Sequence, residues 1–450
     1  MQENSIHPDF IKELDEELQN LIITGIEEFN LEVFNRLALK EFRIQYESIK
    51  PLREYCQVRG ISPETVKTWE EIPALTSQVF KDNVIATFPL HETELVTMTS
   101  GTSNPNAPSK IYRDKKSVET LYMANEIMTR SFLFPDVDRM KILLMVPSPK
   151  IAPAMGMAIG LEHMRQNFGT EDSIYLITPN GMEWELLFSA LNHAVESGEP
   201  VAIVGATSGF VYFFNFCREQ GLRFQLPPGS RICDGGGYLG TFGDCTREEY
   251  LSLCQEFLGV PPEYCVNTLG SAESGTNYFD NVLRNHYLGI SGVPRYKVSP
   301  PWARTIVVDS VSGKRLPQGE IGLLCHYDLV NRANIFALGT GNLGYETEDG
   351  FEIIGRNDAK GKGNFNFSDM QNEKCSTVAD NMLAAFSGKC STVADEMLTA
   401  QEQVCSTASD QLLAQSPHGD MFKGMSSERF EKLKKMCPFL KLQGLLKKSK

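Results

Sequence analysis

Apolar residues recur along this chain with two periods, that of a helix and that of a strand. Near the start, Phe10, Leu14, Leu18, Leu21 and Ile22 share one helix face, which predicts an amphipathic helix over residues 9–29. Further along, short apolar runs are separated by stretches of helical period. The predicted strands are residues 141–147, 173–178, 200–206, 304–309 and 319–327, and the predicted helices are residues 182–196 and 247–258. Strands that alternate with helices predict an α/β fold with a largely parallel sheet.

The pattern changes after residue 363, where the strand-forming runs stop. The phrase Cys-Ser-Thr-x-x-Asp then occurs three times, at Cys375, Cys390 and Cys405, which are 15 residues apart (390 minus 375, and 405 minus 390). We therefore expect a boundary near residues 363–373. The predicted parts are an N-terminal helical region (1–90), an α/β core (91–363), the Cys repeat (364–418) and a basic tail (419–450).

The composition limits the class of protein. The 450 residues are 42% hydrophobic and 22% charged, as in soluble globular proteins, and the net charge of −14 argues against nucleic acid as a partner. No apolar run is long enough to span a membrane, and the acidic start lacks the layout of a signal peptide, so we expect a cytoplasmic protein. The odd number of cysteines, 11, favours reduced thiols. Residues 419–450 hold nine Lys or Arg against three acids, which predicts at most peripheral contact with a membrane.

Several segments carry residues typical of nucleotide chemistry. The segment TMTSGTSNPNAPSK, residues 97–110, is rich in hydroxyls and glycine and ends in a lysine, so its backbone N–H groups and side chains suit phosphate oxygens. The segment LGSAESG, residues 269–275, presents the single carboxylate of Glu273 among small residues, and one carboxylate with phosphate oxygens can hold Mg²⁺. The backbone of DGGGY, residues 234–238, can lie flat against a planar ring. Each segment taken alone is also compatible with an ordinary surface turn.

In this order, the segments resemble those of the adenylate-forming superfamily, the acyl- and aryl-CoA synthetases and their relatives. The resemblance implies the large-domain fold of that family, with two related α/β subdomains and a β-rich segment, and implies ATP and Mg²⁺ as cofactors. It further implies phosphate contacts from the 99–110 loop, Mg²⁺ on Glu273, and adenine flanked by Gly236 and Gly237. The turn at residues 340–342 and the segment GRND, residues 355–358, resemble the family's T-G-D and G-R-x-D motifs, which implies further nucleotide contacts. The cofactor-binding residues implied are Thr99, Ser100, Gly101, Thr102, Ser103, Gly236, Gly237, Gly270, Ser271, Asn342 and Arg356, with Lys110 as a catalytic residue.

Two positions depart from the family pattern. Asn342 stands where the family has a ribose-binding aspartate, and Asn104 stands where a glycine is usual. An asparagine can still hydrogen-bond a hydroxyl but brings no charge, so we expect weaker ribose contacts.

The chain continues from residues 355–358 into the Cys repeat, without the further domain of a standard CoA ligase. In this it resembles the acyl-protein synthetases (LuxE-like enzymes), which carry an acyl group on a cysteine near the C-terminus. This resemblance implies ATP-dependent activation of a long-chain fatty acid, transfer to the protein's own cysteine, and hand-over to an acyl reductase partner. Cys375, Cys390 and Cys405 are then catalytic.

The residues of the repeat support this interpretation. Each cysteine lies two residues before a Thr-x-x-Asp of capping-box form, and a helix start favours a thiolate. In one continuous helix, 15 residues would turn each cysteine by about 60° from the last, so three separate short helices are expected in the C-terminal tail.

Three alternatives remain open. The repeat can be a small helical unit with buried cysteines, because Cys is among the most buried residue types. The protein can be a CoA ligase that releases a free thioester, in which case activity survives the loss of all three cysteines. It can also be a non-catalytic scaffold on a degenerate adenylation fold, in which case ATP does not bind.

Overall fold

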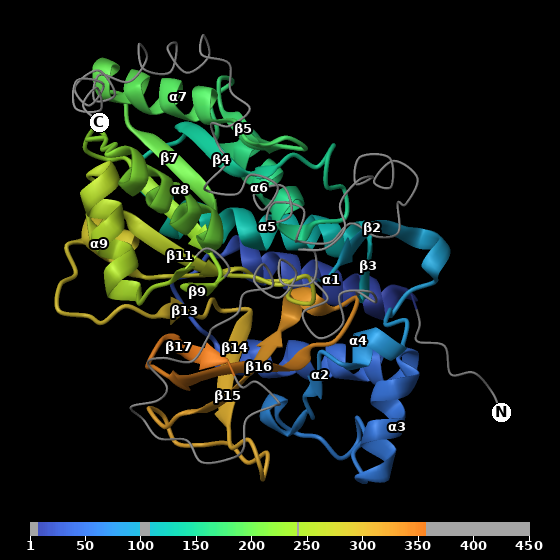
Figure 1. Ribbon diagram of the computed structural model, residues 1–450. Helices are drawn as coiled ribbons and strands as arrows, with labels where there is room; N and C mark the ends of the chain where they lie inside the picture. Colours follow the sequence, from blue (N-terminus) through green and yellow to red (C-terminus); the bar gives the residue numbers. More distant parts are fainter. Residues whose placement is uncertain (1–7, 100–108, 241–242, 357–450) are drawn as a thin grey trace, which may run out of the picture.

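The computed structural model describes residues 8–99, 109–240 and 243–356. Its largest sheet has seven strands in the order β12-β11-β8-β7-β4-β5-β6 (Figure 1). The five inner strands, from β11 to β5, are parallel, and the edge strands β12 and β6 are antiparallel. The bounds are β4 Lys141–Pro147, β5 Ile174–Thr178, β6 Gly181–Met182, β7 Val201–Ala206, β8 Arg231–Gly235, β11 Cys265–Leu269 and β12 Tyr278–Phe279.

Helices cover both faces of this sheet because its strands are apolar on both faces. In β4, Leu143 and Met145 pack with α7, α8 and α9, whereas Ile142, Leu144 and Val146 belong to the core on the side of α5 and α6. These helices are α5 Lys115–Phe132, α6 Gly156–Phe168, α7 Trp184–Ser197, α8 Thr207–Gln220 and α9 Arg247–Leu258. Figure 1 shows α7, α8 and α9 on one side of the sheet.

A second sheet is antiparallel and lies beneath the first in Figure 1. Its order is β13-β17-β16-β15-β14, and the short β1 pairs with β16 in parallel. The bounds are β1 Leu75–Thr76, β13 Lys297–Val298, β14 Ala303–Val308, β15 Gly322–Asp328, β16 Ala337–Glu346 and β17 Gly350–Arg356.

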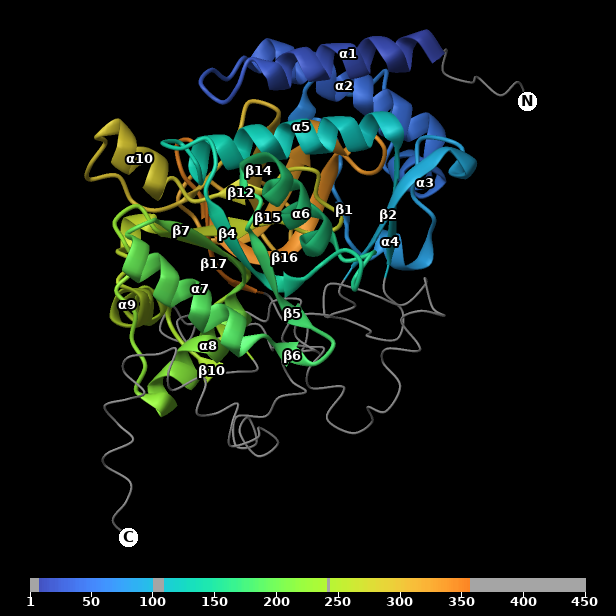
Figure 2. The ribbon, with the colours of Figure 1, turned by 90° about the horizontal axis from the view of Figure 1, so that it is seen from above.

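The N-terminal helix α1 packs on α5. In the view from above, α1 and α2 lie beside α5 (Figure 2), and the Gln19 amide of α1 donates to the Thr120 hydroxyl of α5. The remaining elements are α1 Pro8–Ile23, α2 Leu31–Ser48, α3 Lys50–Val58, α4 Val79–Asp82, α10 Val282–Leu288, β2 Thr93–Met98, β3 Lys110–Asp114, β9 Leu239–Gly240 and β10 Gly243–Asp244, with short 3-10 turns at Trp69–Glu71, Leu90–Glu92, Pro262–Tyr264 and Leu329–Asn331.

Most elements predicted from the hydrophobic pattern are confirmed. The five predicted strands correspond to β4, β5, β7, β14 and β15, and the two predicted helices to α7 and α9. The helix predicted over 9–29 is wrong in length, because it ends at Ile23 before Gly25, whose φ of 89° suits glycine alone. The strand predicted from residue 319 begins at Gly322, after another glycine with positive φ.

In the part of the chain that the structure describes, no helix is long and apolar enough to cross a membrane. The predicted Cys repeat and basic tail, residues 364–418 and 419–450, lie outside the described residues.

Buried charges join the N-terminal helices to the second sheet. Arg332 is 3% exposed and donates to Asp15 of α1 at 2.9 Å and to both carboxylate oxygens of Asp114. Beside it, Glu41 of α2 is fully buried and accepts from Gln45 at 2.9 Å through one oxygen. Its other oxygen has no partner among the described residues. Burial raises the pKa of Glu41 well above its usual value, and the negative charge of Asp328 adds to the effect.

This raised pKa predicts a stability difference between the protein and its Glu41→Gln variant. Between the unfolded-state pKa of about 4.3 and the higher folded-state pKa, the folded protein binds the extra proton, so its free energy of unfolding falls as pH rises. Glutamine mimics the protonated acid and does not titrate. We expect the variant to gain stability over the wild type above pH ~4.5, by up to about 1.4 kcal/mol per pH unit.

Urea unfolding from pH 4 to pH 8 measures this difference. Glu28→Gln, on an exposed loop, is the control and should track the wild type within about 0.5 kcal/mol. A Glu41→Gln protein that is less stable than the wild type at pH 8 would show that Glu41 is ionised in the fold.

Candidate active site

The carboxyl ends of β8 and β11 lie side by side in the large sheet. Their register pairs Asp234 with Asn267 and Gly235 with Thr268. The residues that follow are Gly236 and Gly237 on one strand and Gly270 and Ser271 on the other. Ligands of open α/β sheets bind in the crevice outside the carboxyl ends of the strands. Two of the segments predicted from the sequence therefore meet at the expected edge.

The backbone conformation at the first residue after β8 requires a glycine. Gly236 has a φ of 122°, which side chains rarely tolerate. Its carbonyl accepts from the Asn267 amide at 3.1 Å, so the turn after β8 is fixed to β11.

The predicted phosphate loop opens at the same edge. Its ends are tied together: Thr99 N–H donates to the Ser109 carbonyl, and Ser109 N–H donates to the Thr99 hydroxyl, both at 2.9 Å. Met98 pairs with Lys110 across β2 and β3, and Met98 N–H donates to the Ala154 carbonyl ahead of α6. The side chain of Met157, in the first turn of α6, packs against Gly235. Thr99 and Lys110 thus mark the mouth of a loop beside the end of β8.

A buried ionic cluster lies behind the β8–β11 edge. Lys297 of β13 is 3% exposed, and its ammonium donates to the Asn267 carbonyl and side-chain oxygens and, at 2.6 Å, to Asp280. The Asn267 amide in turn donates to Asp234 at 2.8 Å. Burial raises the pKa of Asp234 to about 6, against its hydrogen bonds from Thr207 and Asn267. Burial alone would also raise the pKa of Asp280, but Lys297 and Arg295 hold it below its usual value.

The Glu273 segment continues from β11 as a compact turn. Gly270 lies so close to the Asn277 side chain that any Cβ there would clash, and the Ser271 hydroxyl accepts from Ser274 N–H at 3.2 Å. Glu273 itself is half-buried. No three His, Cys, Asp or Glu side chains converge to hold a metal ion by themselves anywhere in the described ranges. A metal ion at Glu273 would need further oxygen ligands, and the phosphate oxygens of a nucleotide are of the kind that Mg²⁺ prefers.

Asn342 and Arg356 lie in the second sheet. They face each other across β16 and β17, and Asn342 N–H donates to the Thr340 hydroxyl at 3.1 Å. The sheets are joined near them by Arg247 of α9, which donates to both carboxylate oxygens of Glu352 in β17. Burial of Arg247 opposes its charge, but the Glu352 carboxylate raises its pKa above the usual value.

The predicted residues Ser100, Gly101, Thr102, Ser103, Cys375, Cys390 and Cys405 lie outside the described residues. Of the others, the structure brings Thr99, Lys110, Gly236, Gly237, Gly270 and Ser271 to one edge and places Asn342 and Arg356 in the adjoining sheet.

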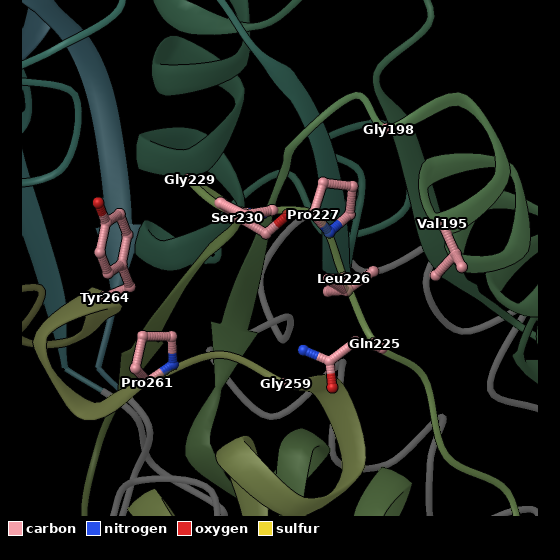
Figure 3. Close-up of a pocket in the computed structure, with 11 residues that line it drawn as sticks. Val195, Gly198, Gln225, Leu226, Pro227, Gly229, Ser230, Gly259, Pro261 and Tyr264 are labelled. Carbon is pink, nitrogen blue, oxygen red and sulfur yellow. The ribbon is translucent and has the colours of Figure 1, made fainter.

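A cavity of about 470 Å³ lies at the opposite edge of the sheet (Figure 3). It is lined by Gln225, Pro227 and Ser230 ahead of β8 and by Pro261 and Tyr264 ahead of β11. Since the strands are parallel, this amino-terminal edge faces away from Gly236 and Gly270. The cavity therefore takes no part in the candidate site.

Comparison with known proteins decides the family. Residues 22–333 match the family model described as acyl-protein synthetase, LuxE. The chain belongs to this family. The acyl-protein synthetase resemblance drawn from the sequence, and with it the expectation of a ligase, is thereby confirmed.

Two curated relatives of this LuxE-family protein are named long-chain-fatty-acid–luciferin-component ligase. The protein of Vibrio harveyi is 23% identical over 320 residues, which cover 69% of this chain and 80% of the relative. The protein of Aliivibrio fischeri is 21% identical, with 70% and 80% covered.

Solved structures of adenylate-forming ligases share the fold of this LuxE-family protein. A 2-hydroxyisobutyryl-CoA ligase in complex with 2-HIB-AMP has a TM-score of 0.55 at 15% identity, covering 79% of this chain and 73% of that chain. An open conformation of the same ligase with 2-HIB-AMP and CoA has a TM-score of 0.56 at 14% identity, with 80% and 81% covered. The likeness establishes the fold class.

Sequence reasoning missed the residues that hold these segments in place. Lys297 and Asp280 belong to no motif, and Lys297 is 30 residues from its partner Asn267. Asp328 offers a faint signal, because it is a lone acid that ends the apolar strand β15. Contacts between distant positions leave no periodic trace in one sequence.

We expect Lys297→Ala to lower the free energy of unfolding by about 3–5 kcal/mol, because Asp280 would remain buried with one of its cations missing. Urea unfolding measures the loss. The exposed Lys314→Ala is the control and should stay within about 0.5 kcal/mol of the wild type. A loss below about 1 kcal/mol would mean that the charge of Arg295 alone is enough to stabilise the buried Asp280 carboxylate.

Proposed function

We propose that this LuxE-family protein activates a long-chain fatty acid with ATP and transfers the acyl group to its own cysteine. The observation that carries the proposal is that Thr99 and Lys110, Gly236, and Gly270 lie at one carboxyl edge of the sheet. The names of the two curated relatives support a long-chain fatty acid as the substrate.

The first step is adenylation. A carboxylate oxygen of the acid attacks the α-phosphorus of ATP, and the bond from that phosphorus to the pyrophosphate oxygen breaks. The roles proposed are phosphate binding by Thr99 and the residues 100–103, and adenine packing by Gly236 and Gly237. Asn342 would contact the ribose, and Arg356 the ribose or a phosphate. Lys110, at the exit of the loop, adds positive charge near the phosphates.

Mg²⁺ is the cofactor that we propose for Glu273. When bound with ATP, it would neutralise the charge that develops on pyrophosphate. One carboxylate plus phosphate oxygens is a donor set that suits this ion.

The second step forms a thioester. A thiolate attacks the acyl carbonyl carbon, the new C–S bond forms, and AMP leaves with the electrons of its bond to that carbon. The thiol proton goes to solvent.

The described cysteines are poor candidates for this thiolate. All seven are buried, and burial raises the pKa of Cys56 and of Cys325 to about 11 each. Burial raises the pKa of Cys233 and Cys254 further. We therefore assign the acceptor role to Cys375, Cys390 and Cys405 of the repeat, from which an acyl reductase would collect the product.

Intact mass spectrometry after incubation with ATP, Mg²⁺ and a panel of fatty acids tests the proposal. We expect hydroxylamine-sensitive acyl adducts on the wild type that disappear when Cys375→Ala, Cys390→Ala and Cys405→Ala are combined. The single variants show whether one repeat carries the acyl group. Cys437→Ala, a cysteine outside the repeats, is the matched control and should keep the adduct.

Two outcomes would contradict the proposal. Release of pyrophosphate with consumption of coenzyme A and no adduct would identify a CoA ligase. Absence of both adduct and pyrophosphate with every acid would favour a non-catalytic scaffold.

Asn342→Asp is a separate prediction on ATP affinity. A charged acceptor makes a hydrogen bond to a ribose hydroxyl stronger by about 1 kcal/mol, so we expect the KM for ATP to fall about fivefold. Pyrophosphate release at varied ATP measures it. An unchanged KM would show that residue 342 does not contact ribose.

A further inference from the structure

The turn that carries Glu273 is anchored by a buried carboxylate, Asp328, at the end of β15. One oxygen of Asp328 accepts from Gly275 N–H at 3.0 Å and from Thr276 N–H at 2.8 Å. The other accepts from the Thr276 hydroxyl at 2.9 Å and from Val330 N–H at 3.0 Å. Asp328 is 1% exposed and lies 52 positions from Thr276 in sequence, so this is a tertiary contact between the second sheet and the turn that follows β11.

Asp328 must be ionised to fill this role. All four of its partners donate, and only a carboxylate accepts at both oxygens without a proton of its own. Burial raises the pKa of Asp328, while the bonds from Thr276 and Val330 and the charge of Arg113 oppose that rise. Arg113 also donates to the Ser274 carbonyl at 3.2 Å, next to Glu273.

A second anchor comes from α5. The Asn125 side chain accepts from Asn277 N–H and donates to the Gly275 carbonyl, each at 2.8 Å. Asn125 is half-buried and 150 positions from Gly275, so this is a second tertiary contact that holds the turn.

The turn is also tightly packed next to the residues that anchor it. A Cβ built on Gly275 would lie 2.7 Å from the Cβ of Val330, which is closer than side chains pack. The backbone on the C-terminal side of Glu273 is therefore fixed by Asp328, Asn125 and the contact with Val330. The position of the Glu273 carboxylate depends on this support.

We propose that Asp328 and Asn125 are positioning residues that hold the Glu273 carboxylate where it ligates the Mg²⁺ of Mg·ATP. The inference rests on the proposed function and adds the residues that make a single carboxylate sufficient. Residues outside the ligand set that orient a metal ligand typically change metal affinity by about 10–100-fold when they are removed. Asp328 and Asn125 would act in this way through residues 275–277, not through the Glu273 carboxylate itself. No motif contains either residue.

Calorimetric titration of the full chain with ATP, once with Mg²⁺ and once with EDTA, tests this role. We expect the wild type to bind Mg·ATP more tightly than metal-free ATP, and Glu273→Gln to lose that preference. Asp328→Asn and Asn125→Ala should lose about 10–100-fold of affinity for Mg·ATP and little for metal-free ATP. A merely structural role would weaken both forms of the nucleotide equally.

Two further variants sharpen the test. Asp309→Asn is the matched control, because Asp309 also accepts from the backbone of a turn, at Val311 and Ser312, but in the loop after β14. It should keep the wild-type preference for Mg·ATP. Asn125→Asp keeps the acceptor for Asn277 but sets a carboxylate oxygen against the Gly275 carbonyl, so it should lose at least as much affinity for Mg·ATP as Asn125→Ala.

Thermal melts of each variant accompany the titrations. If Asp328→Asn does not fold, Asn125→Ala, whose site is half-buried, decides the question. A folded Asn125→Ala or Asp328→Asn protein with the wild-type preference for Mg·ATP would overturn the inference, as would a wild type that binds ATP without regard to Mg²⁺. A wild type that binds no ATP in either form would instead overturn the proposed function, and the inference with it.

Discussion

The ion pair between Lys297 and Asp280 is the contact on which the site geometry depends. Lys297 extends from the antiparallel sheet into the edge of the parallel sheet, where it also binds both oxygens that Asn267 offers. Asn267 then fixes the turn at Gly236. A buried ammonium must be paired, because leaving it alone costs several kcal/mol. The two sheets are therefore held in one relative position, and the glycine turns at the edge follow from it.

The same physical rule, that buried polar groups need partners, holds the Glu273 turn. Asp328 satisfies backbone N–H groups of a segment without regular structure, and Asn125 satisfies another N–H and a carbonyl. The small side chains of such a segment let a ligand approach its backbone closely, but they bury little apolar surface to stabilise the conformation of the segment. Its order comes from hydrogen bonds to side chains on neighbouring elements, which also gives a lone carboxylate a defined position.

The fold and the proposed chemistry divide between different parts of the chain. The α/β body matches the adenylate-forming ligases in fold, and its cysteines are buried within apolar cores. A thiol buried there has no access to the acyl adenylate that we propose forms at the sheet edge. The proposed acceptors are therefore cysteines of the repeat, whose sequence places each one at a predicted helix start.

The sequence by itself determined the α/β class, most strands and helices, and the small-residue segments at the site, because periodicity and local motifs are properties of neighbouring residues. It failed where a single glycine ended α1 at Ile23, since one positive φ outweighs an apolar pattern. Only the tertiary structure decided that Lys297, Asp328 and Asn125 support the site. These residues act across 17 to 150 positions, and the packing of the two sheets and α5 determines which buried donor meets which acceptor.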